Sequence, residues 1–220
     1  VIDEMHMSEV TIAYGMTETS PVSCQTNKHT PLEKQVSTVG LVQPNLEVKI
    51  VDTETGEVVP VGETGELLTK GYSVMKGYWG SRFKTKQSIQ DGWMHTGDLA
   101  TMDEEGYIKV VGRSKDMVIR GGENIYPVEI ENYLYRHPKI SDVQIVGVPD
   151  KKYGEVLAAW IIPRKGVELT EDEVKQFCKD NIAHYKVPQY YHFVTEYPMT
   201  ITGKIQKYKI TEMMIEELGL

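Results

Sequence analysis

The sequence predicts an α+β fold in two units, a β-rich one followed by a small domain in which strands and helices alternate. The 19 glycines are concentrated between Gly56 and Gly122, where they separate short apolar runs, as is typical of strands and turns. Beyond that stretch the spacing of apolar residues switches between strand-like and helix-like. We therefore expect one unit at 1–114, with a β-rich subdomain at about 36–111, and a second unit at 115–220.

Alternation at period two predicts the strands of the first unit. Residues 46–51 alternate between apolar and polar side chains, as in a half-buried strand, and residues 53–56 follow as a turn. Residues 65–70 and 107–111 are predicted as further strands of the same subdomain.

The second unit begins with a predicted helix. Pro127 suits its first turn, where a missing N–H costs nothing, and His137-Pro138 ends it. Residues 143–148 and 156–162 are rich in β-branched side chains and are predicted as strands.

A capping box and a final amphipathic helix complete the second unit. Thr170 and Glu173 form the box, and Cys178 falls on the apolar face of the helix that follows, so we expect it in the core. Residues 190–194 are a strand candidate. The last helix is expected from about Lys207 to Leu218, with these side chains inward: Ile210, Met213, Met214 and Leu218.

Composition excludes several classes of protein. The chain is 40% hydrophobic and 25% charged, which is ordinary for a globular protein. Its net charge of −8 argues against nucleic acid as a partner. Two cysteines make no metal-ligand spacing, and no apolar run approaches the ~20 residues of a transmembrane helix. Because the sequence opens at Val1, we expect a fragment or a processed product.

Four motifs carry possible chemistry, and the first occupies residues 14–19. Gly15 lets the backbone approach a ligand closely, and Tyr14 could stack on a nucleobase. The hydroxyl of Thr17 can hold a phosphate oxygen, and Glu18 can hold Mg²⁺ between phosphates. Alone, such a string is usually a polar turn after a strand.

The second and third motifs combine glycine with charge. Asp98, placed after a glycine turn at the end of residues 93–98, can accept bonds from two vicinal ribose hydroxyls, although a plain hairpin turn is the simpler interpretation. The third motif runs from Gly112 to Glu131. Its Gly121-Gly122 pair permits positive φ and close passage of a slender ligand, and its simpler interpretation is a hairpin before a capped helix.

The fourth motif, residues 198–207, places Lys204 directly after a glycine. A lysine in such a loop can neutralise charge that develops in a transition state. For a lone lysine, however, a solvated side chain would be the simpler interpretation.

In this order and spacing the four motifs resemble those at the C-terminal end of the adenylate-forming (AMP-binding) superfamily, which includes acyl-CoA synthetases, peptide-synthetase adenylation domains and firefly luciferase. The resemblance extends from Tyr14 to the final helix. Residues 120–131, Trp79 and residues 202–207 resemble the acyl-CoA synthetase (fatty-acid–CoA ligase) branch, and within it the medium-chain acyl-CoA synthetase-like family.

The resemblance implies a nucleotide site in the first unit, which would be the C-terminal end of a large N-terminal adenylation domain. By similarity Tyr14 packs on adenine, Thr17 contacts the α-phosphate and Glu18 holds Mg²⁺. Asp98 binds the ribose hydroxyls, and Arg113 also reaches the ribose. ATP or AMP, Mg²⁺ and coenzyme A are the implied cofactors and substrates.

The resemblance also implies that the second unit is a mobile domain serving two half-reactions. Lys115 would be the hinge, a position that is Asp in many relatives, which leaves the energetics of this hinge open. Lys204 would bridge the substrate carboxylate and the α-phosphate while acyl-AMP forms. After rotation, the loop at Gly121-Gly122 would line the tunnel for the pantetheine arm of coenzyme A.

The implied function is ATP-dependent acyl-CoA synthesis, an acid–thiol ligase activity of fatty-acid metabolism. The family's Ser/Thr/Gly-rich phosphate loop should precede Tyr14 and is absent, so we expect this stretch alone to be incomplete and inactive without the N-terminal part. The other expected partners are a carboxylic acid, ATP and coenzyme A. We expect a cytoplasmic or mitochondrial-matrix location; a homo-oligomer stays open.

Two other functions stay open. One is a non-catalytic nucleotide-binding or interaction module that keeps the motifs as scaffold. The other is an enzyme that adenylates amino acids or aryl acids, which the residues around Gly121 disfavour. Lys204 and Asp98 favour the acyl-CoA synthetase, because packing requires neither.

Overall fold

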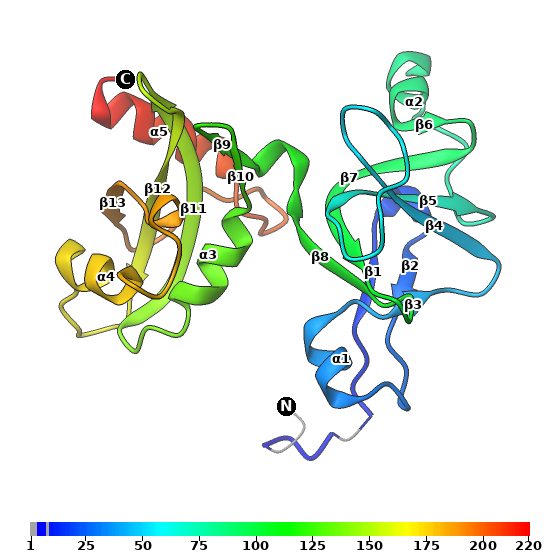
Figure 1. Cartoon of the computed structure of the whole chain (residues 1–220), viewed down its shortest axis with the longest axis horizontal. Coiled ribbons are helices and arrows are strands. Elements are labelled where there is room, and N and C mark those ends of the chain that lie inside the picture. The colour runs from blue at the N-terminus through cyan, green and yellow to red at the C-terminus, as the bar shows by residue number, and fades with distance from the viewer. Residues whose placement is uncertain (1–3, 8) are drawn as a thin grey trace. The chain divides into compact units, whose positions relative to one another are not determined.

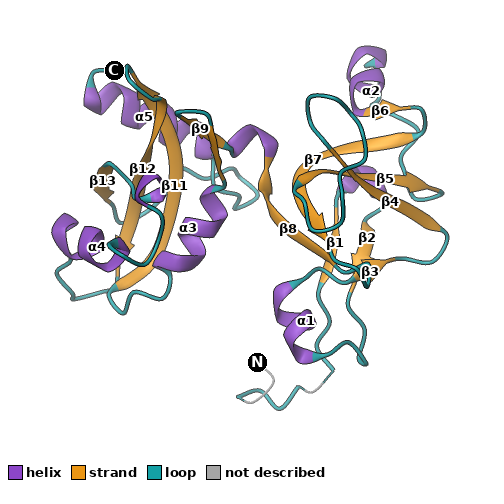
Figure 2. Cartoon of the chain, viewed as in Figure 1, coloured by secondary structure: helices purple, strands orange, loops and turns teal. Residues whose placement is uncertain are grey.

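The computed structural model describes residues 4–7 and 9–220, and the chain divides into two compact units, Val1–Ser114 and Lys115–Leu220 (Figure 1). Both units mix strands with short helices, which confirms the predicted α+β fold class (Figure 2). None of the helices among the described residues combines the length and apolar character that crossing a membrane requires.

Among its described residues, 4–7 and 9–114, the first unit contains two antiparallel sheets. One has the strand order β1-β2-β3, and the other has the order β4-β5-β7-β6, with β8 also paired to β7. The strands are β1 (Ala13–Gly15), β2 (Val22–Gln25), β3 (Leu41–Val42), β4 (Leu46–Val51), β5 (Gly65–Gly71), β6 (Ile89–Gln90), β7 (Trp93–Met102) and β8 (Ile108–Arg113). Its helices are the 3₁₀ turn η1 (Thr17–Thr19), α1 (Leu32–Ser37) and α2 (Arg82–Ser88).

A small apolar core joins the two sheets of the first unit. It is made by side chains that alternate inward along the strands: Cys24, Ile50, Leu67, Ala100 and Ile108. Backbone bonds from Val39 N–H to the Ile108 carbonyl (2.7 Å) and from Ile108 N–H to the Gly40 carbonyl (3.0 Å) tie the segment before β3 to β8. The first motif, on β1 and η1, is thereby attached to the sheet that contains Asp98.

The second unit is built on one mixed sheet with the order β10-β9-β12-β11, in which β13 lies parallel to β12. The strands are β9 (Val118–Arg120), β10 (Glu123–Ile125), β11 (Ile140–Asp150), β12 (Gly154–Pro163) and β13 (Tyr190–Phe193). The helices are η2 (Ser114–Asp116), α3 (Pro127–Leu134), α4 (Glu171–Cys178), η3 (His184–Lys186) and α5 (Lys207–Leu218).

Helices cover both faces of this sheet. Along β12, the side chains of Leu157, Ala159 and Ile161 join a core with residues of α3 and α4, whereas those of Val156, Ala158 and Trp160 join a core with residues of α5. A strand buried on both faces has no polar side to alternate with, which is why residues 156–162 read as a continuous apolar run.

Several local predictions for the second unit are confirmed. Pro127 is the first residue of α3, and Thr170 with Glu173 forms the capping box of α4. Cys178 is fully buried, and burial raises the pKa of its thiol to about 11, so it is a core residue. One prediction is wrong: Met213 is 47% exposed, because α5 faces the sheet with only one narrow side, through Ile210 and Met214.

Candidate functional site

Asp98 lies inside strand β7 and not, as the sequence suggested, after a hairpin turn. The preceding Gly97 has φ +71° while its neighbours continue the strand, and the pairing of β7 with β8 is irregular at Leu99/Ala100. A glycine with positive φ next to such an irregularity bends the strand and redirects the next side chain. The Asp98 residue is only 8% exposed.

Two donors from distant parts of the first unit converge on the Asp98 carboxylate. The Tyr14 hydroxyl donates to Oδ2 at 2.6 Å, and Arg113 Nε donates to Oδ1 at 3.0 Å. Burial, and then the hydrogen bond to the nearby carboxylate, raise the pKa of Tyr14, so its hydroxyl keeps its proton at neutral pH. An ionised carboxylate has about four acceptor sites, so two donors leave it able to accept from a ligand.

Glu66 holds the bent part of β7 and was not singled out from the sequence. Its Oε1 accepts from Gly97 N–H at 2.9 Å, and its Oε2 lies 2.9 Å from His95 Nδ1. Thr96 Oγ1 donates to the Leu67 carbonyl at 2.6 Å in the same region. Nothing in the sequence singles out Glu66 within the predicted strand at residues 65–70. Its partners, Gly97 and His95, come close only when β5 pairs with β7.

The other residues of the first motif lie just beyond Tyr14. Thr17 is exposed at the start of η1. Glu18 accepts from the Tyr78 hydroxyl at 2.9 Å, and its carbonyl accepts from Met75 N–H at 2.8 Å, so both its side chain and its backbone are held. Gly15 approaches the chain that follows so closely that a Cβ would collide with the Pro21 carbonyl. Glycine at 15 is therefore required by this turn.

Within residues 4–7 and 9–220, no group of three or more His, Cys, Asp or Glu side chains could hold a metal ion. Mg²⁺ commonly binds through one or two carboxylates together with substrate phosphates. The single oriented carboxylate of Glu18 fits that shared kind of site and does not make a dedicated protein cage.

In the second unit, Gly121 and Gly122 form the turn between β9 and β10, with φ +61° and +92°. The prediction of positive φ at this pair is confirmed. Gly121 N–H donates to the Tyr153 carbonyl at 2.8 Å, and a Cβ on Gly121 would lie 3.5 Å from the Tyr153 ring. The Arg120 guanidinium also stacks on that ring, 4.7 Å from its centroid.

Lys204 lies on a separate, exposed hairpin of the second unit. Its carbonyl accepts from Thr200 N–H at 2.8 Å, and its N–H donates to Thr200 Oγ1 at 3.0 Å. Gly203, with φ +79°, closes the turn. The backbone of Lys204 is therefore held while its side chain is exposed to solvent.

Lys115 is the first residue of the second unit and the middle residue of η2. Its side chain is exposed. The structure thus brings Tyr14, Asp98 and Arg113 into contact within the first unit. In the second unit it places the glycine pair and Lys204 on two different hairpins.

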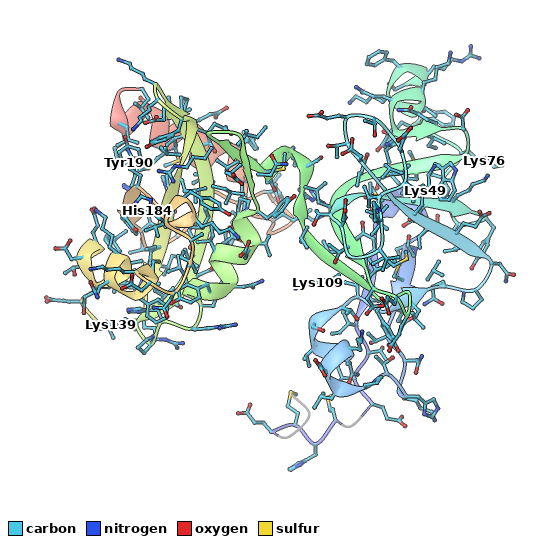
Figure 3. The ribbon with its side chains drawn as sticks, viewed as in Figure 1. Lys49, Lys76, Lys109, Lys139, His184 and Tyr190 are labelled. Atoms are coloured by element: carbon cyan, nitrogen blue, oxygen red, sulfur yellow. The ribbon has the colours of Figure 1, made fainter. Side chains whose placement is uncertain are left out.

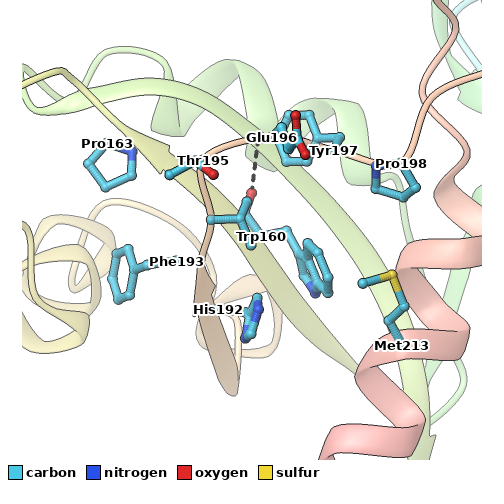
Figure 4. Close-up of a pocket in the computed structure, with 10 residues that line it drawn as sticks. Trp160, Pro163, His192, Phe193, Thr195, Glu196, Tyr197, Pro198 and Met213 are labelled. Carbon is cyan, nitrogen blue, oxygen red and sulfur yellow. Dashed lines mark hydrogen bonds between the residues drawn. The ribbon is translucent and has the colours of Figure 1, made fainter.

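The described cavities of the second unit do not coincide with the predicted chemistry. One, of about 660 Å³, lies between β13 and α5 and is lined by Trp160, His192 and Met213 (Figure 4). Another, of about 800 Å³, lies beside α4 and His184, which is one of the residues labelled in Figure 3. Neither is lined by Lys204, Gly121 or Gly122.

Two family models match the sequence. The model described as AMP-binding enzyme matches residues 2–79, and the model described as AMP-binding enzyme C-terminal domain matches residues 129–204. Together they cover more than half of the chain.

The following relatives and solved structures are considerably longer than this chain. YngI of Bacillus subtilis, named as a candidate acyl-CoA synthetase, is 53% identical over the whole chain, which covers 40% of YngI. The bovine mitochondrial medium-chain acyl-CoA ligase ACSF2 is 48% identical, with 36% of its length covered. ATP-bound MatB from Rhodopseudomonas palustris matches with a TM-score of 0.86 and 35% identity, over 93% of this chain and 40% of MatB. The chain thus spans about two fifths of the proteins it matches.

Proposed function

Because the chain belongs to the AMP-binding enzyme family, we propose that it forms part of an ATP-dependent acyl-CoA synthetase. Such an enzyme joins a carboxylic acid to ATP, giving acyl-AMP and pyrophosphate, and then transfers the acyl group to coenzyme A, releasing AMP. The observation that supports the proposal best is the convergence of Tyr14 and Arg113 on the buried carboxylate of Asp98.

The first unit supplies the nucleotide contacts. Asp98, oriented by its two donors, accepts bonds from the ribose hydroxyls through its remaining lone pairs, and Arg113 reaches the same sugar. Tyr14 presents its ring to adenine. Thr17 and Glu18 stand at the phosphates, where the hydroxyl of Thr17 donates to the α-phosphate.

Glu18, held by Tyr78, is the residue that would hold Mg²⁺ together with the phosphates. When bound, the ion would neutralise phosphate charge during transfer. The contribution of the chain itself is to fix the carboxylate: one oxygen accepts from Tyr78 while the other stays available.

The second unit supplies the groups that differ between the two half-reactions. Lys204 carries a solvent-exposed ammonium on a stiff hairpin, which suits a charge that bridges carboxylate and α-phosphate only while acyl-AMP forms. The glycine turn at Gly121-Gly122 leaves room beside Tyr153 for the pantetheine arm. We assign the change between the two states to a rotation about Lys115.

The comparisons offer two classes of acid, aliphatic and aryl. ACSF2 is named as a medium-chain acyl-CoA ligase, whereas the structure of Bacillus subtilis o-succinylbenzoate CoA synthetase, bound to its acyl-adenylate, matches this chain with a TM-score of 0.85 and 33% identity. We propose a medium-chain fatty acid, since the sequence identity to the medium-chain ligases is higher. For the whole protein we propose the cytoplasm or the mitochondrial matrix.

A chimera that takes the remainder of the chain from YngI tests the proposed reaction, whereas its choice of acid also reflects the YngI part. This chain replaces the segment of YngI to which it aligns, and acid-dependent ATP–pyrophosphate exchange is measured with octanoate and with o-succinylbenzoate. We expect exchange with octanoate and, after addition of coenzyme A, an octanoyl thioester. A folded chimera without acid-dependent exchange, beside an active YngI control, would contradict the proposal.

A further inference from the structure

A partly buried ion pair lies at the base of the hairpin that carries Lys204. Lys207, the first residue of α5, places Nζ 2.5 Å from Oε1 of Glu131 on α3. Of the two side chains, that of Glu131 is 9% exposed and that of Lys207 is 20% exposed. The same carboxylate oxygen accepts from Ile145 N–H on β11 at 2.8 Å. One oxygen thus joins a helix, a strand and the start of another helix.

The ion pair between Glu131 and Lys207 restricts direction, whereas an apolar contact at the same place would not. Burying two charges is costly, and well-packed apolar side chains often stabilise a core as well or better. An ion pair that also engages a backbone N–H, however, allows only a narrow range of positions for the lysine stem. Lys207 Nζ additionally lies 3.4 Å from the Ile145 carbonyl. The first turn of α5 is therefore fixed against β11.

Lys204 is only three residues before this anchor, and hydrogen bonds hold the backbone between them. Gln206 N–H donates to the Pro198 carbonyl at 2.9 Å, and Met199 and Ile205 form an antiparallel bridge. With the two bonds between Thr200 and Lys204, these contacts pair the two arms of the hairpin at residues 198–206. Because these contacts join the two arms, we expect a displacement of Lys207 at the base of the hairpin to displace Lys204 at its tip as well.

The other end of the hairpin is anchored too. Tyr197 is 6% exposed, and its hydroxyl donates to the Trp160 carbonyl on β12 at 3.2 Å, the dashed line in Figure 4. Tyr197 fixes where the hairpin leaves the sheet, whereas Lys207 fixes where it returns. Two anchors on different strands set the direction in which the tip points.

We propose that Glu131 and Lys207 are positioning residues that set the direction in which Lys204 approaches the reacting groups. This inference rests on the proposed function, because it assigns the pair a role in acyl-AMP formation. Lys207 acts through the hairpin and itself touches no substrate.

The test uses the substitution Lys207→Met, which keeps an unbranched stem but removes the charge. In the YngI chimera, we expect kcat for acyl-AMP formation from octanoate to fall roughly 10- to 100-fold, the scale of a misplacement of about 1 Å. KM for ATP should stay within about twofold, because Lys204 acts only while acyl-AMP forms. Thioester formation from supplied octanoyl-AMP should also stay within about twofold, because that step does not use Lys204. Lys209→Met, an exposed lysine on the same helix, is the matched control and should change neither rate.

A second measurement does not depend on activity. Amide hydrogen exchange is followed in the 220-residue chain at Thr200 and Lys204 of the hairpin and at Val146 of β11. With Lys207→Met we expect faster exchange at the hairpin and unchanged exchange on β11. The double variant Glu131→Gln/Lys207→Met, which leaves no unpaired charge, should behave the same way, so loss of folding does not obscure the result.

The outcomes separate the two proposals. If the unsubstituted chimera shows no acid-dependent ATP–pyrophosphate exchange, the result counts against the proposed function. Amide hydrogen exchange in the 220-residue chain still reports on the hairpin in that case. Unchanged hairpin exchange and unchanged acyl-AMP formation in Lys207→Met would overturn the positioning role. Equal loss of both half-reactions, or faster exchange on β11 in both variants, would also overturn it, because the pair would then only stabilise the second unit.

Discussion

Replacement of Asp98 by alanine should have two separable effects, one on the fold and one on nucleotide binding. The side chain of Asp98 is 11% exposed and accepts from Tyr14 and Arg113. A hydrogen bond to a charged acceptor contributes roughly 1.5–3 kcal/mol. The side chain of Arg113 is 57% exposed, so its ion pair contributes only about 0–1 kcal/mol.

Because Tyr14 is only half-buried, the lower part of this range applies, and we expect Asp98→Ala to cost the first unit about 2 kcal/mol. That loss corresponds to roughly 30-fold faster amide exchange on β7 and β8, since every 1.4 kcal/mol is tenfold. Peptides from β11 and β12 in the same sample serve as an internal reference. Lys109→Ala, an exposed side chain on β8 (Figure 3), is the matched control and should leave exchange unchanged.

The effect on binding is measured in the YngI chimera. A hydrogen bond to the ribose is worth about 1 kcal/mol, so Asp98→Ala should weaken ATP about fivefold. Tyr14→Phe removes the donor to Asp98 and keeps the ring, and should destabilise the first unit while changing ATP affinity less. Unchanged ATP affinity in a folded Asp98→Ala variant would refute the ribose assignment, and unchanged exchange on β7 would refute the structural estimate.

Three further predictions concern the second unit. Lys204→Ala should lower acyl-AMP formation by about 100-fold or more yet spare thioester formation from acyl-AMP, measured as separate half-reactions in the chimera; equal losses would count against a rotating unit. Gly121→Val should do the reverse, because φ is +61° and the Tyr153 ring lies 3.5 Å from a Cβ; a loss confined to acyl-AMP formation would contradict it. Burial lowers the pKa of His137, so its neutral form stabilises the fold fully above about pH 6.5, the ordinary value, and this contribution is lost as pH falls. His137→Phe should reduce the pH dependence of the free energy of urea unfolding below pH 6.5, followed by Trp160 fluorescence in a Trp79→Phe/Trp93→Phe background. An unchanged slope would refute this.

The strands at 46–51 and 65–70 and the helix at 207–218 were predictable because each is long enough to show its period. The helices α1 and α2 were not, since they span six and seven residues and bury no side chain. A helix that buries no side chain needs no apolar face, so its sequence shows no helical period.

The predicted site shows the same limit. The motif residues could be named from their order, but the contacts that hold them could not. Glu66, Tyr78 and Lys207 become visible as partners only when strands or helices far apart in sequence pack together. The turn predicted before Asp98 failed because Gly97 bends a strand that continues beyond it.

The two units hold their proposed functional groups in opposite ways, and this difference follows from what each group must do. Asp98 is buried among protein donors, so it is already oriented before a ribose arrives, and its loss harms fold and binding together. Only the backbone of Lys204 is bonded within the hairpin, and its ammonium group is exposed to solvent. Replacement of its side chain should therefore change the stability of the fold little. A group that serves one half-reaction and must then leave cannot be tied into a core. Its direction has to be set from its base, which is where the partly buried pair of Glu131 and Lys207 lies.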